Sequence, residues 1–129
     1  MSFRTIAVIS AIVAFALGLG YLFVGELVVG RWQIQLTQGV LLIGRRIGSL
    51  YLGLSVMFFL ARSAPVSVTR TALSAGTAVA LSLLALLGVY ELTAGHAGPG
   101  ILVSAVIESL LALGYFRILF TERRVPVES

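Results

Sequence analysis

Four apolar stretches, each about as long as a membrane-spanning helix, make up most of this chain. They cover residues 5–29, 39–61, 71–90 and 100–120, and a spanning helix needs about 20 predominantly apolar residues. The mean hydropathy of +1.08 and the 59% share of hydrophobic residues do not fit a soluble protein. Because the connectors have only about ten residues, sequential helices are antiparallel. The sequence therefore predicts an all-α fold, an integral membrane four-helix antiparallel bundle, as a single domain over residues 1–129.

The first apolar stretch has some features of a secretory signal. Arg4 precedes the apolar run, and Ala14-Phe15-Ala16 has the composition of a cleavage site. The run continues to Val29, however, which is longer than the apolar core of a secretory signal. We therefore expect this stretch to be retained as the first transmembrane helix.

Arginine is distributed unevenly between the two ends of the predicted bundle. An even number of spans places both termini on one side, which carries six of the nine basic residues: Arg4, Arg62, Arg70, Arg117, Arg123 and Arg124. The opposite side carries Arg31, Arg45 and Arg46. Cytoplasmic segments of membrane proteins carry an excess of Lys and Arg. This bias predicts that both termini are cytoplasmic.

The connector at residues 30–38 has an alternating pattern. Apolar and polar residues follow one another from Trp32 to Thr37, which is typical of a half-buried extended segment. One interpretation is a loop on the outer membrane surface, with Trp32 as an interfacial anchor. The other interpretation is a loop that gates a substrate site.

Small residues recur at every fourth position in the predicted helices. The faces that result are Ala14/Gly18, Ala16/Gly20, Gly44/Gly48, Ala72/Gly76/Ala80 and Ser74/Ala78/Ser82. Helices in lipid associate by close backbone approach through such faces. These faces predict either the packing of the bundle itself or a homodimer.

Charged residues lie within the outer half of the predicted spans. Glu108 is about eight residues, or about 12 Å, from the outer end of the fourth span. Arg45 and Arg46 lie about six residues, or about 9 Å, into the second span. Ions at membrane depth are expensive unless they are paired or hydrated, so such residues are functional candidates.

We therefore expect a polar cluster in the outer leaflet, in which Glu108 accepts hydrogen bonds from Arg46 or Arg45. The cluster is completed by Glu91, Glu26, Tyr51, Tyr90 and Ser104. Such an ion pair either has a structural role or is part of a ligand or proton site. Alternatively, Arg45 and Arg46 extend toward the lipid headgroups and mark the outer end of a short span.

Several chemistries have no residues to support them. The chain has no cysteine, which excludes disulfides and thiolate ligands. Its one histidine, His96, lies in a predicted turn without partners for a metal site. No nucleotide-binding or catalytic motif is present, and no arginine-rich stripe lies outside the membrane. The sequence predicts no catalytic residues, no metal, no cofactor and no nucleic-acid partner.

Two short motifs resemble a known group of membrane proteins. The run Gly44-Arg45-Arg46-Ile47-Gly48-Ser49-Leu50-Tyr51-Leu52-Gly53-Leu54 looks like the second helix of small bacterial four-helix membrane proteins of the broad DoxX-like group. The acidic residue of Val106-Ile107-Glu108-Ser109-Leu110-Leu111 is similar to one in their last span. The resemblance implies a four-helix bundle in the bacterial inner membrane, with no established activity for most members. Some relatives are linked to quinone-coupled sulfur oxidation, but this chain has no cysteine or helix histidine for that role.

The small multidrug-resistance transporters are similar in length and number of spans. Their essential Glu lies midway along the first helix, whereas residues 5–25 of this chain carry no charge. This departure argues against their mechanism here.

The leading prediction is a non-enzymatic inner-membrane protein. It is either an accessory or scaffold subunit of a larger membrane complex, or a protein that binds a lipid-like molecule in an outer-leaflet polar pocket. The alternative is a small homodimeric transporter that uses Glu108 as a proton- or cation-exchange site. Besides the lipid bilayer, the partners expected are a larger membrane complex or a second copy of the chain.

Overall fold

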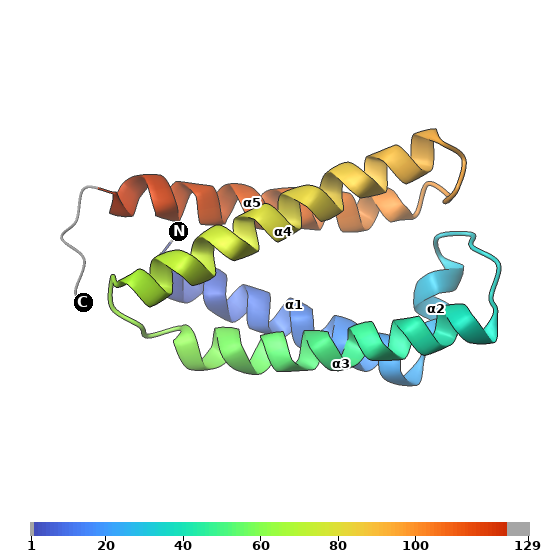
Figure 1. The fold of residues 1–129 in the computed structure, drawn as a ribbon, viewed down its shortest axis with the longest axis horizontal. Helices are drawn as coiled ribbons and strands as arrows, with labels where there is room; N and C mark the ends of the chain where they lie inside the picture. Colours follow the sequence, from blue (N-terminus) through green and yellow to red (C-terminus); the bar gives the residue numbers. More distant parts are fainter. Residues whose placement is uncertain (1, 124–129) are drawn as a thin grey trace.

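Four long helices run antiparallel in the computed structural model, which describes residues 2–123 (Figure 1). The helices are α1 (Phe3–Phe23), the short α2 (Gly25–Gly30), α3 (Gln38–Ala61), α4 (Val68–Thr93) and α5 (Ile101–Glu122). The four long ones are each long and apolar enough to cross a membrane. A helix bonds its backbone groups internally, as a hydrocarbon environment requires. The predicted fold class is confirmed, and the chain is a multi-pass membrane protein.

Three of the long helices begin at a residue whose hydroxyl caps the first turn. The side-chain oxygens of Ser2, Thr37 and Ser67 each accept a hydrogen bond from a backbone N–H three residues later, at 3.2 Å. Such caps bond one of the N–H groups that a helix start leaves without an internal partner. The local sequence therefore sets where α1, α3 and α4 begin.

The first span is shorter than predicted. Residues 5–29 were expected to form one helix, but α1 ends at Phe23 and Val24 leaves the helical region, with φ −132° and ψ 38°. The backbone N–H of Val24 bonds the carbonyl of Gly20 at 2.9 Å, and α2 then begins at Gly25. Glycine is a poor helix former, so a break beside Gly25 costs little. The expectation of an unbroken helix to Val29 is wrong, and Glu26 lies on α2.

The helices pair as two hairpins, α1 with α3 and α4 with α5. In the first hairpin the backbones approach closely where Gly18 faces Gly48. A Cβ on Gly48 would lie 2.8 Å from the carbonyl oxygen of Gly18 and 2.9 Å from the Cβ of Tyr21. Close packing through small residues is therefore confirmed at this crossing, within the chain.

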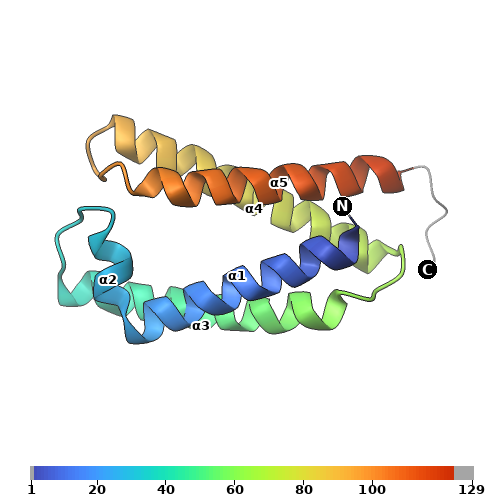
Figure 2. The same cartoon turned by 180° about the vertical axis from the view of Figure 1, so that it is seen from behind.

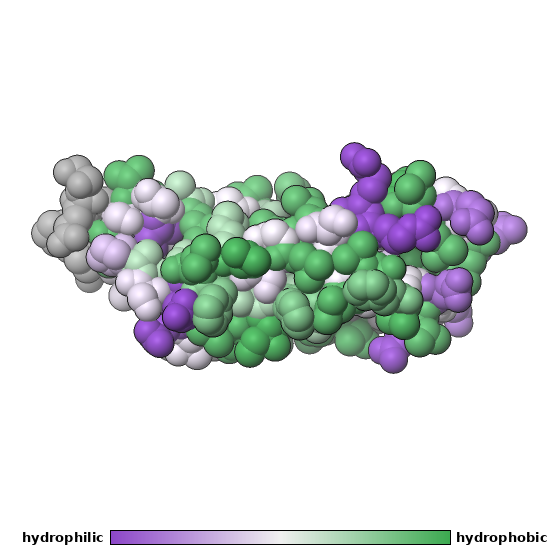
Figure 3. Space-filling model, turned by 90° about the horizontal axis from the view of Figure 1, so that it is seen from below, coloured by the Kyte–Doolittle hydropathy of each residue, from purple (hydrophilic) through white to green (hydrophobic). Residues whose placement is uncertain are grey.

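Hydrophobic side chains cover most of the outer surface. Figure 3 shows them over the middle of the molecule, with hydrophilic residues toward its ends. Large apolar side chains such as Phe15, Leu86 and Leu110 are exposed. A surface of this kind suits contact with lipid chains.

The two hairpins join at the end where α1 begins and α5 ends, which we call the termini end (Figures 1 and 2). A buried core forms there from α1, α3, α4 and α5: Phe3, Ile6, Ala7, Ala11, Phe58, Ala78, Tyr115 and Ile118. Within it the hydroxyls of Ser10 and Tyr115 are hydrogen-bonded at 2.7 Å. This core holds the first turns of α1 against the last turns of α5.

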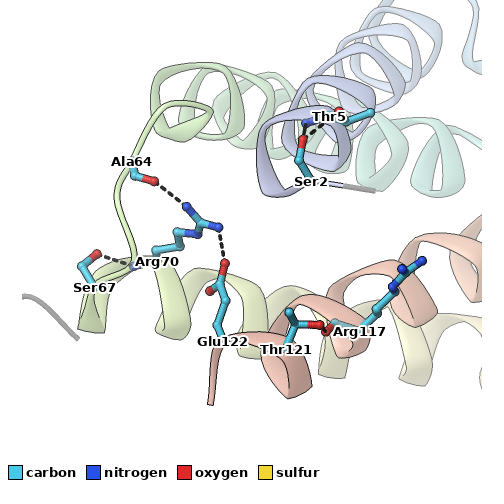
Figure 4. Close-up of polar contacts among 8 residues, drawn as sticks. All are labelled: Ser2, Thr5, Ala64, Ser67, Arg70, Arg117, Thr121 and Glu122. Carbon is cyan, nitrogen blue, oxygen red and sulfur yellow. Dashed lines mark hydrogen bonds and ion pairs between the residues drawn. The ribbon is translucent and has the colours of Figure 1, made fainter. Parts of the chain in front are cut away.

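A polar network reinforces the termini end (Figure 4). Arg70, in the first turn of α4, forms an ion pair with Glu122, in the last turn of α5. Its guanidinium also donates to the carbonyl oxygen of Ala64 at 2.8 Å and lies 4.2 Å from the centre of the Phe3 ring. Arg70 therefore connects α4, α5, the α3–α4 connector and α1.

The opposite end is joined by its two connecting segments, residues 24–37 and 94–100. The backbone N–H of Gly98 donates to the carbonyl oxygen of Trp32 at 2.6 Å. A Cβ on Gly98 would lie 2.5 Å from the side-chain oxygen of Gln33, which shows how closely the two segments approach. The hairpins are thus in contact at both ends of the molecule.

Candidate functional site

A cavity of about 610 Å³ lies between the two hairpins. All four long helices line it, with α3 and α4 supplying most of the wall. Sites for small molecules and cofactors have volumes of about 300–1,000 Å³ and are mostly apolar. The cavity has the size and character of such a site.

Most of the cavity wall is apolar, with few polar side chains. Leu, Ile, Val, Met, Phe and Ala side chains form the wall, and the polar lining residues are Ser10, Tyr51, Thr77, Ser104 and Glu108. Glu108 is the one charged residue in this lining. The wall therefore suits a hydrocarbon chain along most of its length.

One of the predicted small-residue faces creates this space. Ala72, Gly76 and Ala80 of α4 line the cavity instead of packing on a neighbouring helix. Apart from Gly76 itself, the residues next to it and the nearby backbone of α4, no atom of the described residues lies within 4 Å of the position that a Cβ on Gly76 would take. Small side chains on this face leave the volume between the hairpins unfilled.

The cavity opens sideways, between α3 and α4. These helices follow one another in the sequence but do not pack together along their lengths. Lining residues on this side are also exposed at the surface, Leu50 by 64% and Met57 by 41%. Since the surface around this opening is apolar, a molecule in the lipid phase can enter here without crossing water.

A second, smaller cavity of about 330 Å³ lies toward the opposite end. Its wall includes Trp32 and Ile34 from the first connecting segment, Glu91 from α4 and His96 from the second connecting segment. It shares Leu84, Ser104 and Glu108 with the large cavity. The two cavities therefore meet at Glu108.

Glu108 lies two turns into α5 and is half-buried. Within residues 2–123 its carboxyl group makes no side-chain hydrogen bond and no ion pair. Tyr51, on the wall of the large cavity, stacks on Tyr21 with ring centres 6.1 Å apart, and Tyr21 meets Trp32 edge-on at 6.3 Å. An aromatic cluster thus leads from the large cavity to the wall of the small one.

Glu91 has a partner of its own. The Nδ1 atom of His96 lies 2.6 Å from a carboxylate oxygen of Glu91. Both residues line the small cavity, and the His96 side chain is 62% exposed. The polar side of the small cavity therefore faces the surface at the opposite end.

The structure brings together four of the eight predicted site residues: Glu108, Ser104, Tyr51 and Glu91. Among residues 2–123, the predicted ion pair of Glu108 with Arg46 or Arg45 does not form. Both arginines are exposed on α3 and line neither cavity, and neither forms an ion pair with a described residue. The physical reason is that α3 packs on α1 through Gly44 and Gly48, so that Arg45 and Arg46 lie on other faces of the helix.

Two other predicted members of the cluster lie elsewhere. Glu26 is exposed on α2, and Tyr90 is 59% exposed on α4; neither lines a cavity. Glu26 was expected at the outer end of a continuous first helix. Because that helix ends at Phe23 and α2 follows, the position of Glu26 in the sequence does not place it beside the site. For Tyr90 the helical phase decides, because Glu91, one residue later, faces the small cavity.

Sequence reasoning missed other residues of the site. Trp32 and Ile34 form part of the small cavity wall, so the connector folds over the end of the bundle. The alternation of Trp32 and Ile34 with Gln33 and Gln35 indicated that one side of this connector is covered. Leu36 continues the alternation but is exposed. The ion pair of Arg70 and Glu122 was also missed, although both lie at facing ends of antiparallel neighbours.

The side chains of the site supply hydrogen-bond donors and acceptors that suit binding. No three His, Asp or Glu side chains gather in the described part of the chain to hold a metal ion. A carboxyl group, four hydroxyls and a long apolar wall can orient an amphiphilic molecule. No known protein family, curated protein or solved structure matches this chain.

Proposed function

We propose that this protein binds a lipid-like molecule in the cavity between its hairpins and has no enzymatic activity of its own. The observation that carries this proposal is the apolar cavity of about 610 Å³, lined by four helices and open toward the lipid phase. A membrane bundle that served only as a scaffold would have no need to keep this volume unfilled, because packing drives helix association in lipid.

The position of the cavity also supports binding over transport. A transporter that used Glu108 would have to expose it to both sides of the membrane in turn. Toward the opposite end, the small cavity gives Glu108 a route to the surface. Toward the termini end, the core around Ile6 and Tyr115 blocks any continuation. The transporter therefore remains the second candidate, and it requires the hairpins to separate at the termini end.

We place the protein in a bacterial inner membrane with both termini in the cytoplasm. The arginine bias supports this orientation, and the resemblance to the DoxX-like group supports the bacterial membrane. In this orientation Glu108 lies in the outer half of the bilayer, and the small cavity faces the outer surface. An accessory role in a larger complex is compatible with binding, since the bound molecule would then be presented to a partner.

A photoreactive long-chain alcohol, dodecanol with a diazirine near the end of its tail, tests the proposal in phosphatidylcholine nanodiscs. Saturable labelling is expected on cavity-lining residues such as Thr77 and Leu81. Gly76→Leu fills the cavity and should reduce this labelling at least tenfold. Gly53→Leu is the matched control, because Gly53 also has nothing within 4 Å of its Cβ position but lines neither cavity.

Mapping the labelled sites by mass spectrometry separates binding from lipid contact. Labelling that never saturates, falls on outward residues such as Leu86 and is equal in both glycine variants would refute the proposed function. Folding of both variants is checked by their retention times in size-exclusion chromatography.

A further inference from the structure

The two cavities differ in chemistry on either side of Glu108. The large one offers an apolar wall, and the small one adds Trp32, Glu91 and His96. Because they share Leu84, Ser104 and Glu108, one molecule can occupy both. Its tail would lie in the large cavity and its polar head at Glu108 and beyond.

Apart from His96, the side chains around the junction that can carry a charge at neutral pH are the carboxyl groups of Glu91 and Glu108. Neither cavity is lined by arginine among the described residues, and the chain contains no lysine. The two carboxyl groups on the walls are not equivalent. Glu91 has His96 as a partner at 2.6 Å, whereas Glu108 has none within the described chain. Away from water, a carboxylate is stabilised by a positive charge or by hydrogen-bond donors.

The aromatic side of the small cavity favours a cationic head group, as the Glu108 carboxylate does. Trp32 forms part of its wall and is held there by an edge-on contact with Tyr21 and by the backbone bond from Gly98. Tryptophan attracts cations to its ring face more strongly than the other aromatic residues do. A cationic head group would therefore find the Glu108 carboxylate and an indole in adjoining walls.

We infer that the ligand is a cationic amphiphile, an apolar chain that carries a protonated amine. The amine binds at the junction of the two cavities, where it donates hydrogen bonds to the Glu108 carboxylate and to Ser104, and the chain lies along the Ala72–Gly76–Ala80 face of α4. This inference rests on the proposed function and adds the head-group chemistry. An anionic head group would instead bring like charges together at Glu108.

Displacement of the photoreactive alcohol tests this inference. Dodecylamine, dodecanol and dodecanoate have the same chain length and differ only in the head group. Each is titrated as a competitor at pH 7 in phosphatidylcholine nanodiscs that hold the full chain. Dodecylamine should displace half of the label at a bilayer mole fraction at least tenfold lower than the other two competitors. It should also change the emission of Trp32, the one tryptophan of the chain.

Two carboxyl variants assign the effect to a residue. Glu108→Gln keeps the shape of the side chain and should reduce the displacement by dodecylamine to the level of dodecanol. Glu26→Gln removes the same charge from an exposed site that lines neither cavity, and it should leave the tenfold preference unchanged.

The outcomes separate the two proposals. Equal displacement by the three competitors in the unmodified protein overturns the inference and leaves the proposed function standing. A preference for dodecylamine that both carboxyl variants keep shows that Glu108 does not select the head group, which also overturns it. A lack of saturable labelling in the cavity refutes the proposed function itself.

Discussion

At the scale of single residues, the polar groups between the helices differ in how far they are buried. Glu108 stays accessible at the meeting point of two cavities, whereas Ser10 and Tyr115 are buried against each other. Tyr115 is 0% exposed, and its hydroxyl bonds that of Ser10 at 2.7 Å. The first group is suited to a ligand and the second to holding α1 on α5.

Replacing Tyr115 with Phe should lower the free energy of unfolding by about 0.5–2 kcal/mol, because one interhelical hydrogen bond is lost while the ring stays. Ser10→Ala should have a similar effect. The double variant should be less destabilised than the sum of the two, since each single change removes the same bond. Unfolding in mixed micelles with a rising fraction of SDS measures these differences. Strict additivity would show that the bond does not stabilise the protein.

At the scale of helices, small residues have two opposite uses. On α1 and α3, Gly18 and Gly48 allow the backbones to touch, whereas Gly76 on α4 keeps a cavity open. The sequence spacing of four residues is the same in both cases. Which use applies depends on whether another helix faces the small residues, and that is set by the pairing of the hairpins.

Gly48→Ala should destabilise the α1–α3 hairpin by about 1–3 kcal/mol, as overpacking in a closely packed contact does. The new Cβ would lie 2.8 Å from a backbone oxygen of Gly18, which cannot rotate away as a side chain can. Gly53→Ala on the same helix is the control, because its Cβ would meet nothing within 4 Å. The same SDS titration compares the two variants. A loss of stability as large in Gly53→Ala as in Gly48→Ala would contradict the packing argument.

At the scale of the whole molecule, the hairpins differ in how they are joined at the two ends. The termini end has a core of buried side chains and the Arg70–Glu122 ion pair. The opposite end has the backbone bond from Gly98 to Trp32 and the close approach of Gly98 to Gln33. The cavity lies between these two contacts and opens toward lipid. Because the two ends differ, the orientation of the molecule in the membrane decides which leaflet Glu108 lies in.

The absence of cysteine makes the orientation directly measurable. Gln35→Cys places a thiol in the exposed connecting segment of the opposite end, and Thr69→Cys places one in the exposed first turn of α4 at the termini end. With both termini in the cytoplasm, a membrane-impermeant maleimide should label Gln35→Cys in intact bacterial spheroplasts. It should label Thr69→Cys only after lysis. The reverse pattern would place Glu108 in the inner leaflet.

The sequence by itself determined the membrane class, the number of long helices and three of the helix starts. These follow from local properties: apolar runs of sufficient length, and hydroxyls at Ser2, Thr37 and Ser67 that bond their own first turns. The candidate site was predicted only in part. Glu108 was identified as a candidate from its depth in the fourth span, because depth can be obtained by counting residues from the end of the span.

Only the tertiary structure decided which polar residues meet. The face that each helix turns toward its neighbours depends on how those neighbours pack. Arg45 and Arg46 are therefore exposed and form no ion pair with Glu108, although they lie at a similar depth. The break at Val24 removed Glu26 from the site, and a fold of the connector brought Trp32 into it. The cavity itself is a property of four helices in two hairpins, because no single helix shows whether its small residues will be covered.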